Sequence, residues 1–397
     1  MRLYEKTHPW ITFKLDLVSE MDHEAWMLLG EAVSKMDHIA GVPLHPDVAS
    51  ELNQVYLSKG AHATTQIEGN TLSESEVRRR VNNDLKLPPS REYLGQEIDN
   101  VIEGYNLIID HLVEEKPIAL TPERIKEFNS IVLRNLPPKE GVVPGQVRTD
   151  SVMVGDVYRG APAEDCEYLL RAMCDWLDAI RGIDGTLHRP MAVLAAIMAH
   201  LYTAWIHPFG DGNGRTARLI EYQMLIQAGT PTVAAHVLAD HYNRTRTEYA
   251  RQLHLTSARE PYSVKGLIKY ALQGLVDGLA QQIDEIRRDQ FRVTWVNFIY
   301  EQFHDKDTPA CARQRKLVLS LPPSTITQRS EIRELTPALA LAYAGKEEKT
   351  VTRDLNALRE MGLIRVKRNS RGAVTAVRPN VARLRAFMPL VASPDNI

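Results

Sequence analysis

One segment of twelve residues, His207 to Arg218, concentrates more reactive side chains than any other part of the chain. It reads His-Pro-Phe-Gly-Asp-Gly-Asn-Gly-Arg-Thr-Ala-Arg. Its imidazole, with an ordinary pKa of ~6.5, can accept a proton near neutral pH. Its carboxylate is the kind of oxygen ligand that Mg²⁺ uses beside phosphate oxygens, and its two guanidinium groups, three positions apart, would lie on one side of a helix. These residue types together favour a site for a nucleoside triphosphate beside a general base.

Two apolar segments, 191–206 and 219–226, enclose these residues and must position them. Pro208 and three glycines between them forbid a continuous helix, so the sequence predicts a helix, a tight loop and a second helix that begins between 213 and 215. The first turn of the second helix would present unpaired N–H groups and a partial positive charge to a phosphate. The alternative interpretation is a glycine-rich connection between helices whose charges are merely solvated.

The same segment resembles the signature H-x-F-x-D/E-G-N-G-R-x-x-R of the Fic family of nucleotidyl transferases, and every specified position is met. Members of that family transfer AMP from ATP to a hydroxyl of a target protein. The resemblance implies that His207 deprotonates the hydroxyl and that Asp211 is the Mg²⁺ ligand. It also implies that Asn213 and nearby backbone N–H groups form an anion hole for the α-phosphate, and that two arginines hold the β- and γ-phosphates. The nucleotide-binding residues would thus include Gly210, Gly212, Asn213, Gly214, Arg215 and Arg218.

Two further features bear on the nucleotide. A lysine at position 214 marks family members that phosphorylate their targets, whereas this chain has Gly214, which favours adenylylation. The stretch Tyr242-Asn243-Arg244, followed by Glu248-Tyr249, resembles the family stretch beside the nucleoside, in which Tyr and Asn contact adenine or ribose. Tyr242 and Asn243 therefore join the expected nucleotide-binding residues. ATP and Mg²⁺ are the expected substrate and cofactor.

A predicted helix of about 47–69 ends in a second segment of interest. Gly69 is a typical signal for a helix C-terminus, and Glu68 lies in the last turn, where the helix dipole disfavours a carboxylate without a nearby cation. Thr64-x-x-x-Glu68-Gly69 resembles the S/T-x-x-x-E-G/N inhibitory motif that precedes some Fic cores. The resemblance implies that Glu68 pairs with Arg218 and blocks the productive position of the γ-phosphate. The alternative is a solvated glutamate at a fraying helix end.

A β-branched segment bounded by glycines, 146–154, predicts a small β-hairpin with its turn near 149–151. In Fic proteins a hairpin called the flap aligns the target by adding it as a strand. The position of this hairpin before the signature favours that role. An ordinary surface hairpin is the alternative.

The bulk properties exclude several classes of protein. An apolar fraction of 44% and a net charge of −2 over 397 residues are normal for a soluble protein of more than one domain. No apolar run approaches the ~20 residues of a membrane span, and no N-terminal signal peptide is visible. The three cysteines form no C-x-x-C pair, so neither a disulfide framework nor a zinc site is indicated. We expect a cytoplasmic protein without membrane association, which agrees with the use of ATP.

The C-terminal part differs from the rest in charge. Residues 312–397 contain sixteen Lys and Arg against seven Asp and Glu, a net charge of +9, whereas residues 1–311 carry −11. This asymmetry suggests an anionic partner. Helical segments up to 348–359 precede two alternating segments, 364–366 and 373–377, an order that resembles a winged helix-turn-helix.

That resemblance implies DNA as a partner. The side chains expected in a DNA groove are Thr350, Thr352, Arg353 and Asn356, and those expected on phosphates are Arg368 and Arg371. The alternative is a winged helix used only for protein contacts or dimerisation.

We therefore expect a mainly α protein in three parts. These are an N-terminal helical region (1–110) with the inhibitory helix at about 47–69, a Fic-type helical core with a hairpin flap (111–304), and a winged-helix domain (305–397).

The resulting hypothesis is an autoinhibited protein adenylyltransferase that modifies a Ser, Thr or Tyr hydroxyl of a target protein or of itself. In one alternative, the same site with Glu68 engaged positions water and removes AMP from a modified protein. In another, the chain is a DNA-binding transcription regulator that only senses ATP, although sensing alone would not need His207. Relatives of this architecture often pair, so a homodimer is a further expectation.

Overall fold

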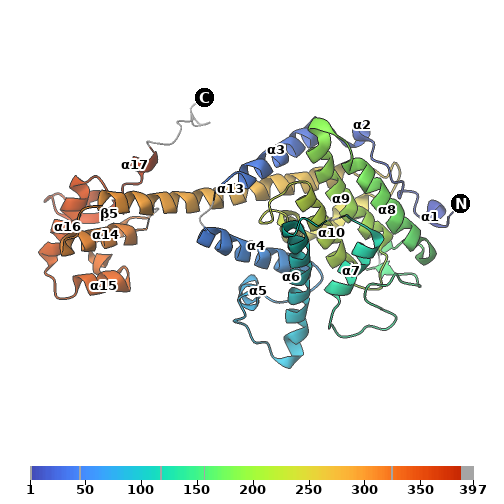
Figure 1. Cartoon of the computed structure of the whole chain (residues 1–397), viewed down its shortest axis with the longest axis horizontal. Helices are drawn as coiled ribbons and strands as arrows, with labels where there is room; N and C mark the ends of the chain where they lie inside the picture. Colours follow the sequence, from blue (N-terminus) through green and yellow to red (C-terminus); the bar gives the residue numbers. More distant parts are fainter. Residues whose placement is uncertain (1, 44–45, 117–118, 156, 323–324, 386–397) are drawn as a thin grey trace. The chain divides into compact units, whose positions relative to one another are not determined.

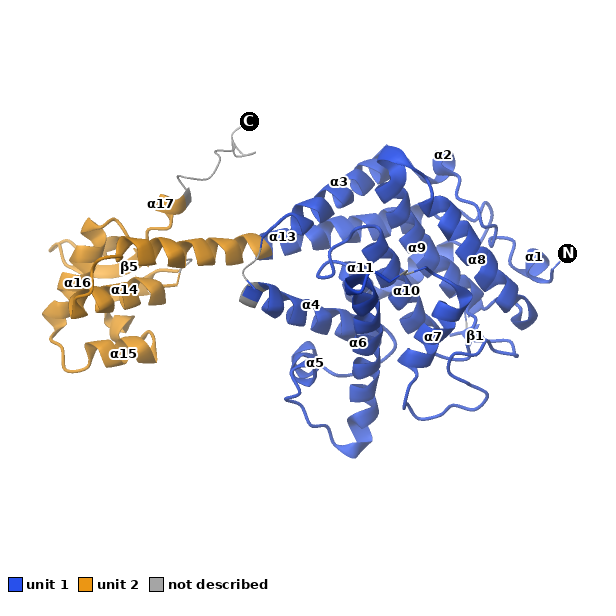
Figure 2. Cartoon of the chain, viewed as in Figure 1, with its two compact units in different colours: residues 1–285 blue, residues 286–397 orange. Residues whose placement is uncertain are grey.

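The computed structural model describes residues 2–43, 46–116, 119–155, 157–322 and 325–385. The chain divides into two compact units, residues 1–285 and 286–397 (Figure 2). Helices dominate both units, with a two-stranded sheet in the first and a three-stranded sheet in the second (Figure 1). The prediction of a mainly α protein with small β elements is confirmed.

The first unit is built almost entirely from helices, and the division between the units falls inside the last of them, α13. The α-helices are α1 (Tyr4–Thr7), α2 (Leu17–Glu20), α3 (His23–Ala40), α4 (Pro46–Ile67), α5 (Glu74–Val81), α6 (Glu92–Val113), α7 (Pro122–Val132), α8 (Cys166–Arg181), α9 (His188–Ile206), α10 (Asn213–Gln227), α11 (Val237–Arg244), α12 (Arg246–Leu255) and α13 (Lys265–Gln302). Short 3-10 helices are η1 (Pro89–Arg91), η2 (Ala163–Asp165) and η3 (Gly185–Leu187), and the strands are β1 (Met153–Val154) and β2 (Tyr158–Arg159).

Helix α9 forms the centre of this unit. From Met191 to Ile206 nearly every side chain of α9 is buried, as expected for a helix that is apolar on all sides. Helix α10 packs along α9, α8 packs against α9, and α7 packs against α10. The loop that joins α9 to α10 is therefore held at both ends by helices of the core.

The hairpin lies further along the chain than predicted. Its strands β1 and β2 are antiparallel and lie on either side of Gly155, with Met153 opposite Arg159. The predicted turn at 149–151 is wrong. The backbone N–H of Arg148 donates instead to the carbonyl of Pro208 at 3.0 Å, so the preceding segment pairs with the loop after α9 rather than with a second strand.

The second unit has the order of elements predicted for a winged helix-turn-helix. Its elements are α14 (Pro309–Ser320), β3 (Thr327–Gln328), η4 (Arg329–Glu334), α15 (Pro337–Tyr343), α16 (Glu348–Glu360), β4 (Ile364–Arg368), β5 (Val374–Pro379) and α17 (Ala382–Arg385). The sheet order is β3-β5-β4, and all neighbours are antiparallel. Strand β3 is an addition that the sequence analysis did not include.

The second unit begins within α13, at Ile286, whereas the sequence analysis set the boundary at residue 305. The reason is packing, because Trp295, Ile299 and Phe303 belong to the buried core of this unit, together with Leu317 and Leu355. Residues 386–397 of the expected domain lie outside the described residues. None of the described helices combines the length and apolar character needed to cross a bilayer.

Candidate active site

The loop between α9 and α10 has the predicted form. Helix α9 ends at Ile206 and α10 begins at Asn213, and two loop residues have left-handed backbones, His207 with φ 49° and Gly212 with φ 75°. The Asn213 side chain closes the loop, since its Nδ2 donates to the Phe209 carbonyl at 2.8 Å and its Oδ1 accepts from the Phe209 N–H at 3.0 Å. The amide expected in an anion hole is therefore engaged in shaping the loop.

Two glycines of the loop meet neighbours that leave little space for a side chain. A Cβ at Gly210 would lie 3.0 Å from Cγ2 of Val142. A Cβ at Gly214, in the first turn of α10, would lie 2.0 Å from Oε1 of Glu68. The Glu68 carboxylate thus covers the helix N-terminus at the place where a phosphate would approach.

The imidazole of His207 is uncharged at neutral pH. Burial disfavours the imidazolium form and lowers the pKa of His207 to about 4, and the charge of Arg148 acts in the same direction. The carboxylates of Glu68 and Asp211 oppose this shift but do not overcome it. The neutral ring is the form that can accept a proton.

Asp211 lies at the edge of the loop with its side chain 23% exposed. Its Oδ2 is 2.6 Å from Nζ of Lys139 and 3.8 Å from Nη2 of Arg215. Burial raises the pKa of Asp211, but hydrogen bonds from Lys139 and from the Gly212 N–H outweigh burial, so the pKa lies below its ordinary value. A single ionised carboxylate of this kind suits Mg²⁺ that arrives with phosphate oxygens and keeps several waters. The described residues contain no group of three or more metal-ligating side chains that would hold a metal alone.

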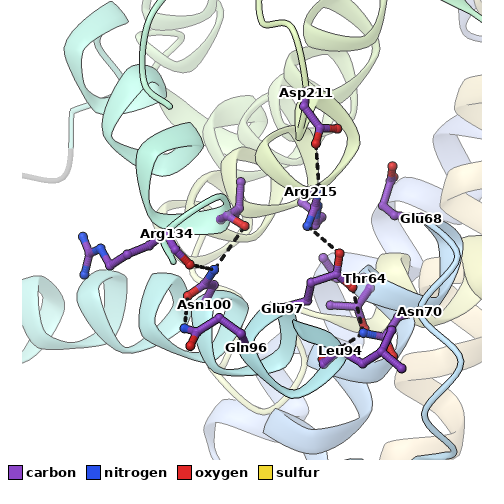
Figure 3. A network of polar contacts seen from close by, with 12 residues as sticks. Thr64, Glu68, Asn70, Leu94, Gln96, Glu97, Asn100, Arg134, Asp211 and Arg215 are labelled. Atoms are coloured by element: carbon purple, nitrogen blue, oxygen red, sulfur yellow. Dashed lines mark hydrogen bonds and ion pairs between the residues drawn. The ribbon is translucent and has the colours of Figure 1, made fainter. Parts of the chain in front are cut away.

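Arg215 belongs to a polar network that links three helical segments (Figure 3). Its Nη1 donates to Oε1 of Glu97 on α6 at 3.1 Å. The other oxygen of Glu97 accepts from Nδ2 of Asn70, just after α4, at 2.8 Å, and the same Nδ2 donates to the Leu94 carbonyl. Arg215 is therefore held between Glu97 and the loop carboxylate Asp211, with its side chain only 5% exposed.

The sequence analysis missed Glu97 and Asn70. Glu97 precedes Arg215 by 118 positions, so no local pattern connects them. The one available signal was that Glu97 lies beside the apolar residues Leu94 and Val101 on the buried side of α6, where an isolated charge needs a partner.

Arg218 lies on the same helix but contacts the end of α4. Its Nη2 donates to Oε1 of Glu68 at 2.5 Å and to the Thr64 carbonyl at 2.9 Å, while its own side chain is 1% exposed. Burial raises the pKa of Glu68, but the charge of Arg218, its hydrogen bond and the charge of Arg215 together outweigh burial, so the pKa of Glu68 lies below its ordinary value and the pair is ionised. Thr64 is itself fully buried, and its hydroxyl lies 3.1 Å from the hydroxyl of Tyr105.

Local backbone geometry presents Glu68 to this arginine. Gly69 has φ 98°, its N–H donates to the Gln66 carbonyl, and the N–H of Asn70 donates to the Thr65 carbonyl. This is the Schellman arrangement that ends helices at a glycine. It turns the chain sharply after Glu68, as the glycine signal predicted.

Only some of these groups share a cavity. Glu68, His207, Gly214 and Arg218 border one of roughly 500 Å³, whereas Asp211 and Arg215 line a different cavity together with Glu97. The walls of the first cavity come from α4, the hairpin, α9, α10 and α12, and they include Glu68, Tyr158, His207, Gly214, Arg218 and Tyr249. His200, on α9, also lines it. The Nε2 of His200 is 2.8 Å from the Tyr249 hydroxyl, and its Nδ1 is 3.3 Å from Oε2 of the buried Glu221.

The positions of Tyr242 and Asn243 correct an expectation. Neither residue lines this cavity, which has Tyr249 on its wall instead. Tyr242 is buried behind Tyr249, with stacked rings whose centroids are 4.7 Å apart, and its hydroxyl donates to Glu221. Asn243 donates to the Gln66 side chain at 2.8 Å. Both side chains lie outside the cavity because helix α11 directs Tyr242 toward α10 and Asn243 toward α4.

Comparisons with known proteins agree with this geometry. Residues 119–225 match the model of the Fic/DOC family. The chain carries a Fic domain. Relatives of the domain include protein adenylyltransferase fic-1 of Caenorhabditis briggsae, 31% identical over 49% of this chain and 35% of the relative. Protein adenylyltransferase Fic of Nematostella vectensis is 30% identical over 55% of this chain and 48% of the relative.

This chain spans less than half of the length of these two relatives. A solved structure of a Fic family protein from Desulfovibrio desulfuricans has the same fold, with a TM-score of 0.56 over 90% of this chain and 96% of that one. The two sequences are 17% identical, so this likeness concerns the fold alone.

Proposed function

We propose that this protein transfers AMP from ATP to a Ser, Thr or Tyr hydroxyl of a protein, either a partner or itself. The observation that carries the proposal is the single cavity bordered by a neutral His207, the N-terminus of α10 at Gly214 and the buried Arg218. A base, an anion-binding helix end and a guanidinium group are the parts that phosphoryl chemistry requires. The names of the relatives support the same reaction.

In the proposed step, the target hydroxyl attacks the α-phosphorus of ATP in line with the departing oxygen. His207 takes the hydroxyl proton through its neutral imidazole. A new bond forms between the hydroxyl oxygen and the α-phosphorus, and the bond from that phosphorus to the bridging oxygen breaks. Pyrophosphate leaves with the electron pair.

The phosphates would lie over the first turn of α10. Backbone N–H groups around Gly212 and Gly214, in a loop shaped by Asn213 and Gly210, would bind the α-phosphate. Arg215 and Arg218 would hold the β- and γ-phosphates as bidentate donors. Asp211 would hold Mg²⁺, which neutralises phosphate charge when bound.

We further propose that Glu68 inhibits this reaction. Two contacts of the Glu68 carboxylate support inhibition, the ion pair with Arg218 at 2.5 Å and the close approach to Gly214. In both, the carboxylate lies where the γ-phosphate would bind. Thr64 and Gly69 hold this arrangement in place. The Thr64 carbonyl accepts a hydrogen bond from Arg218, and Gly69 forms the turn that ends α4 and directs Glu68 toward that arginine.

The same residues could also remove AMP by hydrolysis. With Glu68 in place, the site could orient water toward the phosphorus of an AMP-modified side chain. A bond from the water oxygen to phosphorus would form, the bond from phosphorus to the side-chain oxygen would break, and AMP would leave while the side chain regains its hydroxyl proton. The test is transfer of labelled AMP from α-labelled ATP with Mg²⁺, and release of label from pre-modified protein, for the wild type, Glu68→Gly and Glu68→Gly/His207→Ala. Label that appears only with Glu68→Gly supports an inhibited transferase. Release by the wild type without transfer by any variant would assign the chain to AMP removal.

A second function, DNA binding, is favoured by the surface of the C-terminal unit. Arg353 on α16 and Arg371 between β4 and β5 are exposed, and Nη2 of Arg368 donates to Oδ1 of Asn356 at 3.2 Å, which ties the wing to α16. These positions suit a helix in the major groove and a wing on the phosphate backbone. Thr352 is less available, because its hydroxyl accepts from Arg329.

The test is a mobility-shift titration of duplex DNA with the full chain at several salt concentrations. We expect Arg353→Ala/Arg371→Ala to weaken binding, because a groove contact of α16 is lost, and to flatten its salt dependence, because a phosphate contact of the wing is lost. Arg181→Ala, a surface arginine of α8, is the control. No binding by the wild type at low salt would limit this unit to protein contacts.

The remaining expectations about partners and location stay proposals. Because ATP is the proposed substrate, we propose the cytoplasm as the site of action. The proposed homodimer is tested by light scattering of the full chain at micromolar concentration, where a monomer mass would contradict it.

A further inference from the structure

The C-terminal end of α9, which leads into His207, is covered by one segment of the chain. We call residues 148–155 and 157–161 the flap segment. Four successive backbone carbonyls, at positions 205 to 208, accept hydrogen bonds from it. The bonds run from the Tyr158 hydroxyl to Trp205 at 2.7 Å, from the Ala161 N–H to Ile206 at 3.2 Å, from Nε of Arg148 to His207 at 2.8 Å, and from the Arg148 N–H to Pro208 at 3.0 Å.

Arg148 is the centre of this cover. It is 8% exposed, and among the residues that the structure describes its guanidinium group donates to backbone carbonyls alone. Besides His207, these belong to Asp150 at 2.5 Å, to Ile206 at 3.5 Å and to Ala161. The C-terminal end of a helix has unpaired carbonyls and a partial negative charge. A buried guanidinium group here supplies hydrogen-bond donors to these carbonyls and a positive charge that the helix dipole favours.

The residue that Arg148 contacts has an uncommon backbone conformation. His207 has φ 49°, a left-handed conformation that residues with a Cβ rarely adopt, and its N–H still donates to the Thr203 carbonyl of α9. Such a conformation persists when the surroundings hold it. The space is closed from the other side as well, because a Cβ at Gly160 would lie 2.9 Å from both the Cβ of His207 and Nη2 of Arg148.

We infer that Arg148 is a positioning residue for His207. The N–H donors of the Arg148 guanidinium group hold the backbone of His207 in the conformation that aims its imidazole at the target hydroxyl. The inference rests on the proposed function for the role of that imidazole. The flap segment would then have two roles, to align the target and to position the proposed base, because it is hydrogen-bonded to the backbone of His207. Lysine could not replace Arg148, because one ammonium group cannot reach all the carbonyls that the separate N–H donors of the planar guanidinium group reach.

Electrostatics agree with this geometry. The groups whose charges act on the His207 imidazole are the Arg148 guanidinium from the flap segment, Glu68 from the end of α4 and Asp211 from the loop. Burial is the main reason that the pKa of His207 is low, and the Arg148 charge contributes in the same direction. Loss of Arg148 would remove a positive charge and loosen the cover over the ring, and both changes raise the pKa of His207.

The experiment uses the full chain with Glu68→Gly, so that transfer is measurable, and adds Arg148→Gln, Arg148→Lys or the control Arg171→Gln. Arg171 is an exposed arginine of α8 away from the cavity. We expect Arg148→Gln to lower kcat about 100-fold with unchanged ATP affinity, the loss typical of a small misplacement of a reacting group. Arg148→Lys should keep the charge and still lose most of the rate. An unchanged kcat in either Arg148 variant would overturn the inference.

A second measurement does not depend on activity. The His207 resonance, assigned by its loss in His207→Asn, is titrated by NMR in the otherwise unmodified chain and in Arg148→Gln. We expect the pKa of His207 to rise above its value of about 4 in Arg148→Gln and to stay unchanged in Arg171→Gln. A pKa that stays low in Arg148→Gln would overturn the inference. Absence of transfer with Arg148 intact would instead refute the proposed function and leave the NMR result to decide the role of Arg148.

Discussion

Replacing Glu68 by glycine tests the central ion pair of the site. In the wild type, the Arg218 side chain is 1% exposed and its Nη2 lies 2.5 Å from the Glu68 carboxylate. The substitution leaves a buried cation with the Thr64 carbonyl as a remaining partner. Breaking a fully buried ion pair costs about 3–5 kcal/mol, and we expect about 2–3 kcal/mol here because Glu68 is 30% exposed.

This free energy predicts two opposite effects. Without nucleotide, Glu68→Gly should melt about 5 °C below the wild type, since 1 kcal/mol corresponds to about 2–4 °C in domains approaching this size. With ATP and Mg²⁺, the γ-phosphate can replace the lost carboxylate, so the stabilisation by ligand should exceed that of the wild type. If the pair is the whole barrier to productive binding, AMP transfer should rise by roughly 30- to 150-fold, because about 1.4 kcal/mol is tenfold.

The assay combines thermal unfolding at increasing ATP with transfer of labelled AMP. Glu68→Gln is the matched variant, because it keeps the shape and one acceptor oxygen but removes the charge, and it should lie between the other two. A Glu68→Gly protein with wild-type stability and unchanged or lower transfer would refute the reasoning. It would show that the ion pair neither stabilises the resting site nor restrains the reaction.

Three further predictions concern the proposed base, the first turn of α10 and the buried histidines. His207→Ala should abolish transfer in the Glu68→Gly background, and transfer at the rate of the parent variant would remove His207 as the base. Gly214→Ala should stabilise the Glu68→Gly protein by about 0.5–1 kcal/mol, the usual gain of alanine over glycine in a helix, but not the wild type, where its Cβ would meet the Glu68 carboxylate at 2.0 Å. Equal effects in the two backgrounds, measured by denaturant unfolding, would contradict the close approach. Burial lowers the pKa of His207 to about 4 and that of His236 to about 3, so the unfolded chain binds more protons than the folded one below pH 6.5. The melting temperature should therefore fall as the pH drops from 6.5 toward 4, and His236→Asn should make that fall shallower. A melting temperature independent of pH over this range would exclude neutral buried imidazoles.

Local features of the chain followed from its sequence. The loop between α9 and α10 and the start of α10 were predicted from proline and glycine positions alone, because these residues restrict the backbone regardless of their surroundings. The caps are similar. Ser73 and Glu76 form a capping box at the start of α5, and Thr121 caps α7 before a proline at its first position, and both sequence patterns are typical of helix starts. Each of these interactions spans at most a few residues.

Pairings between distant residues were beyond reach from the residues themselves. Glu68 and Arg218 are 150 positions apart, and only the resemblance to a family joined them before the structure did. Glu97, Asn70 and Arg148 had no such guide, because their partners lie on other helices or on backbone carbonyls that carry no sequence signal.

The choice between Tyr242 and Tyr249 shows the physical reason. Both are aromatic residues near each other in sequence, and composition cannot tell which ring faces the cavity. That depends on the rotation of α11 and α12 against α9 and α10, which is set by side-chain packing across the whole core. The order of amino acids is enough to say which reactive groups this protein has and where its helices break. Which of these groups meet follows from the fold, because each contact depends on the packing of helices far apart in the chain.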